Sequence, residues 1–138
     1  MPNQLYHLRF CTHRRGTVFS NFWAARTLVR CLKNKDARGH TQTVAFVVMP
    51  DHVHWLCHLG RSITLAAAVG SLKSEVSRAL RGFGELPQPL WQDGYFDRAL
   101  REWEDPAGVA RYIVLNPVRA GLVRTIREYP HWDCIWVR

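Results

Sequence analysis

The chain has 138 residues, of which 47% are hydrophobic, so it is long and apolar enough for one folded domain over residues 1–138. Its 19 lysines and arginines exceed its 11 aspartates and glutamates, and the formal net charge of +8 favours a polyanionic partner such as nucleic acid. A basic surface without such a partner is the alternative. No apolar stretch approaches membrane-spanning length and the four cysteines form no C-x-x-C pair, so we expect an intracellular protein that does not enter a membrane.

The first forty residues predict a strand, a helix and a loop. Apolar and polar residues alternate over 5–12, which indicates a half-buried strand. Apolar residues recur at helical spacing over 20–32, and Ser20 is a suitable N-cap. The polar stretch 33–40 contains a glycine, so we expect a loop there.

A β-hairpin is expected next, because two apolar runs, 44–48 and 55–59, flank a Pro-Asp turn. Successive side chains of a strand point to opposite faces, so His52 and His54 share one face of the second strand. Two imidazoles placed in this way can bind one metal ion. The alternative is an ordinary polar strand face without a metal.

The second half of the chain predicts two helices and two strand-like segments. Apolar residues over 62–83 form one stripe, which is typical of an amphipathic helix. Segments 90–100 and 129–137 are aromatic and strand-like, and Asp105 is a good N-cap for a short helix that ends near Pro117. This order of elements predicts an α+β, ferredoxin-like sandwich: an antiparallel sheet with helices on one face, plus an added C-terminal helix.

The short helix carries side chains that complement the two histidines. Tyr112 and Asn116 are four residues apart and therefore lie on the same face of a helix. A phenol can attack phosphorus and hold a covalent phosphotyrosine, but its free pKa of about 10 means that it needs a nearby cation or metal. The alternatives are an aromatic residue at the edge of the core for Tyr112 and a turn residue for Asn116.

Two motifs in this order resemble those of the single-tyrosine HUH transposases, specifically the REP-associated tyrosine transposases. They are 49–55 (MPDHVHW) and 112–123 (YIVLNPVRAGLV), and 91–101 resembles the segment between them in that family. The resemblance covers most of the chain. It implies an enzyme that uses Mg²⁺ or Mn²⁺ to cleave and rejoin single-stranded DNA beside hairpins, which in this family are repetitive extragenic palindromes.

The same resemblance implies a role for each matched residue. His52 and His54 would be the metal ligands, Asn116 would be the third polar group of the site, and Tyr112 would form the 5′-phosphotyrosine link. Relatives commonly have a histidine two positions after the tyrosine, where this chain has Val114. A residue two positions along a helix points away from the first, so Tyr112 can still meet the metal.

Several basic and aromatic residues are candidates for DNA binding, because phosphate contacts supply most of the affinity and unpaired bases stack on rings. The basic candidates are Arg14, Arg15, Lys73, Arg78, Arg101, Arg111 and Arg119. The aromatic candidates, for which burial in the core is the alternative, are Trp55, Trp91, Tyr95 and Phe96.

Two other functions stay open at this stage. One is a non-catalytic nucleic-acid-binding domain with a degenerate site, and the other is a metal-dependent nuclease that activates water at the histidines. Within the transposase interpretation we expect a cytoplasmic, nucleoid-associated protein. It would act as a monomer or a homodimer.

Overall fold

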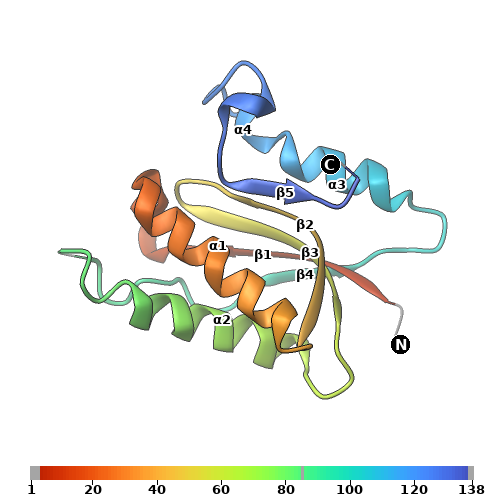
Figure 1. Cartoon of the computed structure of the whole chain (residues 1–138), viewed down its shortest axis with the longest axis horizontal. Coiled ribbons are helices and arrows are strands. Elements are labelled where there is room, and N and C mark those ends of the chain that lie inside the picture. The colour runs from red at the N-terminus through yellow and green to blue at the C-terminus, as the bar shows by residue number, and fades with distance from the viewer. Residues whose placement is uncertain (1–3, 85, 137–138) are drawn as a thin grey trace.

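The structure, a computed structural model, describes residues 4–84 and 86–136 and contains a five-stranded antiparallel sheet in the order β4-β1-β3-β2-β5 (Figure 1). The strands are β1 (Leu5–Cys11), β2 (Thr41–Val48), β3 (His52–Leu59), β4 (Phe96–Ala99) and β5 (Trp132–Cys134). The first four strands follow the ferredoxin-like order, and β5 extends the sheet beside β2. This confirms the predicted fold class, and it makes β3 the central strand.

Helices cover both faces of the sheet. The α-helices are α1 (Phe22–Ala37), α2 (Leu65–Ala79), α3 (Pro106–Val114) and α4 (Asn116–Arg119), and the short 3₁₀ turns are η1 (His13–Arg15), η2 (Val18–Ser20) and η3 (Ile126–Glu128). Figure 1 shows α1 and α2 together on one face, whereas α3 lies on the other face beside β2 and β5. No helix in the described part of the chain is both long and apolar enough to cross a membrane.

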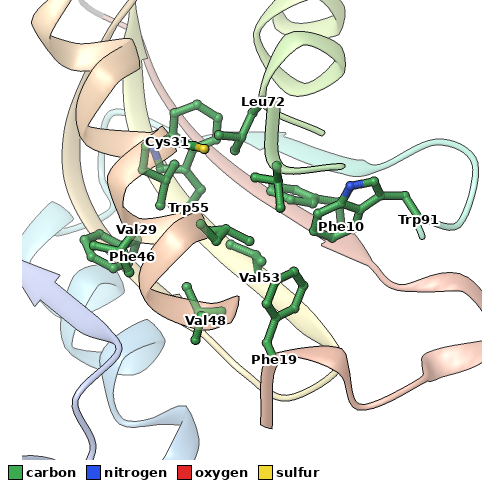
Figure 2. Packing of buried hydrophobic residues seen from close by; sticks show 14 of the residues in the cluster. Phe10, Phe19, Val29, Cys31, Phe46, Val48, Val53, Trp55, Leu72 and Trp91 are labelled. Atoms are coloured by element: carbon green, nitrogen blue, oxygen red, sulfur yellow. The ribbon is translucent and has the colours of Figure 1, made fainter. Parts of the chain in front are cut away.

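Two hydrophobic cores hold these layers together. The larger lies between the sheet and the pair α1 and α2, where Phe10, Val53, Trp55 and Leu72 are buried (Figure 2). The smaller lies between the sheet and α3, which contributes Ala110, Ile113 and Val114. Burying such side chains stabilises the fold by roughly 25 cal/mol for each Å² of apolar surface removed from water. α3 lies mainly against β2 and β5, and the polar residues His7, Arg9, His52 and His54 of β1 and β3 remain partly exposed.

The loop predicted over 33–40 is wrong for its first half, because α1 continues to Ala37. The reason is an ion pair between helices: Lys35 is 1% exposed and its ammonium contacts the carboxylate of Glu75 in α2. The predicted cap Ser20 belongs to η2. Asn21 caps α1 instead, and its Oδ1 accepts hydrogen bonds from two backbone N–H groups of the first turn, both at 3.0 Å.

Other boundaries also differ from the predictions. The helix expected over 62–83 spans only Leu65–Ala79, because Thr64 caps its start and a loop follows Leu80. Within 90–100 only Phe96–Ala99 forms a strand, since Gly94 turns the chain with a φ of +80°. Of the segment 129–137, residues 132–134 form β5 and Val137 lies outside the described residues. The cap Asp105 is confirmed for α3, where its carboxylate accepts from a backbone N–H.

Candidate functional site

The two histidines of the H-x-H motif lie on the central strand and share the sheet face opposite α1 and α2. Their neighbours Val53 and Trp55 are fully buried in the larger core, so the alternation of the strand turns both imidazoles the other way. The ring centroids of His52 and His54 are 5.0 Å apart, with the ring planes at 79°. The shared face predicted from the sequence is therefore confirmed.

His54 is hydrogen-bonded to a third histidine, His7, from the neighbouring strand β1. Their ring nitrogens, His54 Nδ1 and His7 Nε2, are 2.9 Å apart. Burial, with added repulsion from nearby cationic groups, lowers the pKa of His54 to about 3 and that of His7 to about 4. Both rings are therefore neutral near pH 7, and one donates the hydrogen bond that the other accepts.

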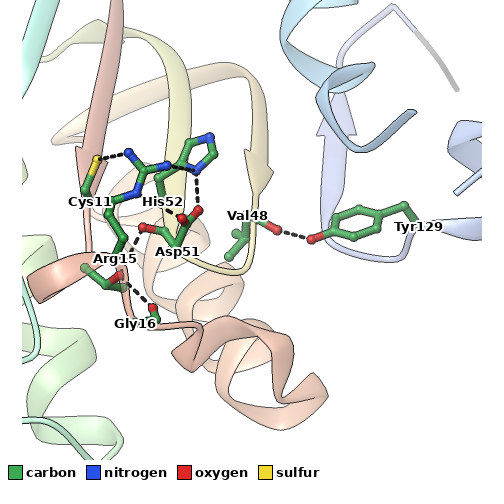
Figure 3. Close-up of polar contacts among 8 residues, drawn as sticks. Cys11, Arg15, Gly16, Val48, Asp51, His52 and Tyr129 are labelled. Carbon is green, nitrogen blue, oxygen red and sulfur yellow. Dashed lines mark hydrogen bonds and ion pairs between the residues drawn. The ribbon is translucent and has the colours of Figure 1, made fainter. Parts of the chain in front are cut away.

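His52 is held in a different way, by the carboxylate that precedes it (Figure 3). Its Nδ1 lies 2.7 Å from Asp51 Oδ1, and the other carboxylate oxygen accepts from Arg15 Nε at 2.9 Å. Arg15 Nη2 also lies 3.4 Å from the same Nδ1, but a nitrogen that donates to Asp51 has no lone pair left to accept from arginine. We therefore assign the short, charge-assisted contact as the hydrogen bond.

The pKa values around His52 fit this assignment. Burial lowers the pKa of His52, and the hydrogen bond to Asp51 opposes the shift only in part. Burial alone would raise the pKa of Asp51, yet its hydrogen bonds with Arg15 and His52 outweigh that effect and lower it. The site near pH 7 therefore contains a neutral imidazole beside an ionised carboxylate.

This arrangement fits a metal ion. The Nδ1 atoms of His52 and His54 are both engaged, and no hydrogen bond is found to either Nε2 within residues 4–84 and 86–136. Two imidazoles that bind one ion through nitrogens about 2.1 Å from it place their ring centres about 5 Å apart, which agrees with the separation observed. No group of three or more His, Cys, Asp or Glu side chains that could hold a metal occurs among the described residues.

Tyr112 lies on α3 and lines a cleft that also includes His7, whereas His52, His54 and Asn116 are not among its described walls. The residue is 63% exposed, and the guanidinium carbon of Arg119 lies 3.8 Å from the ring centroid. The cleft has a volume of about 530 Å³, and its walls include Tyr112, Arg98 and His7. One open space thus joins the phenol to the histidine that is hydrogen-bonded to His54. A further cavity of about 200 Å³, between α1 and β5, is remote from these residues.

Asn116 and Val114 lie on either side of the end of α3. Asn116 is the first residue of α4 and is half-buried, so its role toward a metal stays a prediction. Val114 is 4% exposed and packs in the smaller core, whereas Tyr112 faces solvent. A histidine at position 114 would therefore be directed into the core and not into the cleft.

The candidate DNA-binding residues fall into two groups. Two are already engaged: Arg15 pairs with Asp51, and Lys73 Nζ donates to the backbone carbonyls of Gln92 and Gly94 at 2.9 and 2.7 Å. Burial lowers the pKa of Lys73. The remaining arginines are exposed: Arg14, Arg78, Arg101, Arg111 and Arg119.

The aromatic candidates also divide. Trp55 and Trp91 are 0% and 8% exposed and belong to the larger core, and Tyr95 is half-buried against it. Phe96 is 58% exposed on β4 and has the Arg9 guanidinium over its ring. Of the four, only Phe96 is exposed to solvent.

Sequence reasoning missed His7, Arg9 and Arg98, and it gave Asp51 only a turn role. A signal for the first two was present: in the alternating strand 5–12 they occupy the face opposite Tyr6, Leu8 and Phe10. Their partners could not be read from the sequence, because the contact of β1 with β3 joins residues almost fifty positions apart.

Fold and site together define a class of protein: a ferredoxin-like domain with an H-x-H pair on its central strand and a tyrosine on a helix beside the sheet. Residues 1–115 match the family described as Transposase IS200 like. The chain belongs to this family of IS200-like transposases.

Individual relatives agree with the family. The chain is 30% identical over 100 residues to a protein of Haemophilus influenzae named as a REP-associated tyrosine transposase, a match that covers 65% of this chain and 57% of that protein. The chain thus aligns with little more than half of the relative's length.

Solved structures show the same fold. A REP-associated tyrosine transposase bound to a REP hairpin is 19% identical, with a TM-score of 0.78, and the match covers 96% of this chain and 77% of the other. A transposase structure from Deinococcus radiodurans is 29% identical, with a TM-score of 0.61 over 79% of this chain and 87% of its own.

Proposed function

We propose that this chain is a metal-dependent transposase that cleaves and rejoins single-stranded DNA beside hairpins, through a phosphotyrosine at Tyr112. The observation that carries the proposal is the cleft, which an exposed phenol shares with a histidine that is hydrogen-bonded to one of the H-x-H pair. Family membership supports the reaction class. The likeness to a relative bound to a REP hairpin supports a hairpin as partner, at the level of the shared fold.

His52, His54 and Asn116 would hold the divalent ion, for which we propose Mg²⁺ or Mn²⁺. When bound, the ion supplies positive charge that polarises the scissile phosphate. Asp51 and His7 act as positioning residues: each accepts from the Nδ1–H of a ligand histidine and so leaves its Nε2 lone pair free for the ion. His7 must then carry its own proton on Nδ1.

Tyr112 acts as the nucleophile. Its Oη attacks phosphorus, a P–Oη bond forms, and the bond between phosphorus and the 3′-oxygen breaks. The tyrosine loses its phenolic proton, and the departing oxygen takes up a proton to give a 3′-OH. In the reverse direction a 3′-OH attacks the phosphotyrosine and restores the phenol. The Arg119 guanidinium over the ring stabilises negative charge on the attacking oxygen.

The net charge of +8 supports a DNA partner, and exposed arginines would contact its phosphates. We propose Arg14, Arg78, Arg101, Arg111 and Arg119 for this role, with smaller contributions from the engaged Arg15 and Lys73. Binding of this kind weakens steeply with salt. A DNA partner would also bring the protein to the nucleoid of the cytoplasm.

A cleavage assay on labelled hairpin DNA with Mg²⁺ or Mn²⁺, run under denaturing conditions, tests this function. We expect cleavage that stops in EDTA, in Tyr112→Phe and in His52→Ala. Cleavage that survives Tyr112→Phe but stops in His52→Ala would select a nuclease that activates water. Salt-sensitive binding without metal-dependent cleavage of any hairpin would select a non-catalytic DNA-binding domain.

A further inference from the structure

The half of the sheet that α3 leaves uncovered carries an ordered row of side chains. In the strand register, Arg9 of β1 pairs with His54 on one side and with Phe96 of β4 on the other. Directly paired residues of antiparallel strands share a face, so Phe96 and Arg9 lie on the face of the H-x-H pair. Two strand spacings separate Phe96 from His54, which is about 10 Å.

Three exposed aromatic residues in and after β4 and on α3 each have an arginine over the ring. Phe96 is 58% exposed with Arg9 at 4.3 Å from its ring centroid, and Trp103 is 76% exposed with Arg101 at 5.2 Å. The third pair is that of Tyr112, already described. The rings come from β4, from the turn after it and from α3, so they are distributed along the chain that borders the cleft.

The cleft borders the segments that carry these rings. Its walls include Arg98 of β4, the residues Glu104 and Asp105 that directly follow Trp103, and Tyr112 itself. Arg98 also forms an ion pair with Glu104, which fixes the turn that presents the tryptophan. Phe96 and Trp103 do not line this cleft themselves, but Arg98, two residues after Phe96, and Glu104, next to Trp103, do.

An unpaired nucleic-acid strand is the ligand that such a surface fits. Exposed rings stack on unpaired bases regardless of sequence, whereas the bases of a duplex are already stacked on one another. The arginines beside the rings add cation–π attraction and phosphate contacts. The 10 Å between Phe96 and His54 corresponds to about three stacked nucleotide steps of about 3.4 Å. A second copy of the chain fits less well, because it would bring arginine against arginine.

We propose that Phe96 and Trp103 stack unpaired bases of the strand whose phosphate reaches Tyr112. This deepens the proposed function, on which it rests for the identity of the strand as substrate. It assigns the binding of the single strand to the open half of the sheet, apart from whatever surface holds the duplex stem.

Binding measured without chemistry tests this assignment. Fluorescence anisotropy in EDTA would compare a labelled unpaired oligonucleotide with a duplex of the same sequence, for the full chain and for Phe96→Leu and Trp103→Leu. Trp23→Leu is the matched control, since Trp23 is 68% exposed but lies at the start of α1. Unfolding midpoints of all variants show that each remains folded.

We expect each of the two variants to weaken single-strand binding by about fivefold to about a hundredfold, while duplex binding changes by less than about twofold. The control should bind like the unaltered chain. Equal losses for single strand and duplex would overturn the proposal, as would unchanged single-strand binding in both variants. If the two substitutions change only the molecular mass of the protein in solution, the rings contact a second copy of the chain. That result would also overturn the proposal.

The result of this binding test is independent of the result of the cleavage assay, because EDTA removes the metal-dependent reaction. A domain that never cleaves DNA could still pass this binding test. Conversely, a chain that cleaves hairpins but binds single strands equally well without Phe96 and Trp103 would retain the proposed function and lose this inference.

Discussion

His7 Nε2 lies 2.9 Å from His54 Nδ1, so a residue of the first strand sets which nitrogen of the H-x-H motif can face a metal. Neutral imidazole has one protonated nitrogen, and a partner that accepts at Nδ1 leaves the lone pair on Nε2. Asp51 does the same for His52 with a carboxylate. The two histidines of the H-x-H motif are thus oriented by different partners, from different parts of the chain.

Replacing His7 tests this orientation. His7→Phe removes the acceptor, and we expect Mn²⁺ affinity to fall by about 10- to 100-fold, which is typical for loss of such a partner. His7→Gln retains an acceptor oxygen near the same position and should recover most of the affinity. Titration of free Mn²⁺ by electron paramagnetic resonance measures both. Equal losses in the two variants would mean that His7 contributes packing and not the hydrogen bond.

Asp51→Ala should weaken metal binding to a similar extent, because it removes the acceptor for His52 and leaves Arg15 without its carboxylate. Asp51→Asn keeps an acceptor but removes the negative charge, so we expect an intermediate affinity. The same Mn²⁺ titration applies. An unchanged affinity in Asp51→Ala would contradict the role of this carboxylate.

Stability should decline as the pH falls from 7 to 5. The folded-state pKa values of His7 and His54, about 4 and about 3, lie below the ordinary 6.5, so across this range the unfolded chain binds more protons than the folded chain. The free energy of unfolding therefore decreases with acid, and it recovers above pH 6.5. Thermal unfolding midpoints at both pH values measure the effect.

His7→Gln removes one of these titrating groups, so the decrease in its unfolding midpoint between pH 7 and pH 5 should be smaller. Buffers of equal ionic strength keep charge screening constant. A midpoint that rises with acid in the unaltered chain would contradict the neutral state of the buried histidines.

At the buried pair Lys35–Glu75, a single substitution should lower the free energy of unfolding much more than the double substitution. Glu75→Leu leaves the ammonium of Lys35 buried without its partner, which costs about 3–5 kcal/mol in the free energy of unfolding. Adding Lys35→Met should restore most of the loss. Arg38 also lies near Glu75, at 3.5 Å, but is largely exposed, so Arg38→Met should cost less than about 1 kcal/mol.

Urea unfolding of these variants measures the free energies of unfolding. If the double variant is as unstable as Glu75→Leu, burial of an unpaired charge is not the cause. In that case the helix packing itself would depend on the ion pair.

The same pair explains one limit of sequence reasoning. Residues 33–36 are polar and look like a loop, yet α1 continues through them because Lys35 finds a partner on α2, forty residues away. The helix propensity of a local segment gives no information about such a distant contact. The end of α2 shows the opposite case: the helix predicted to reach Phe83 ends at Ala79, although Leu80 is still buried, and Phe83 is 39% exposed.

At the site, the sequence could predict only the features that depend on local periodicity. The period of two on β3 put His52 and His54 on one face, and the Asp105 cap placed Tyr112 on a short helix. The partners that orient the histidines needed the pairing register of β1 with β3, which arises only in the assembled sheet. The arginines over the exposed rings of Phe96 and Trp103 likewise depend on the tertiary structure.

The central claim, that Tyr112 becomes covalently attached to DNA, is tested most directly by end-labelled hairpin substrates with Mn²⁺ on a denaturing gel. A 5′-phosphotyrosine retains the downstream fragment, so the 3′-labelled substrate should give a labelled protein band and the 5′-labelled one a free fragment. Tyr112→Phe should abolish the band, while the control Tyr95→Phe should retain it. A labelled protein band of undiminished strength in Tyr112→Phe would contradict the account.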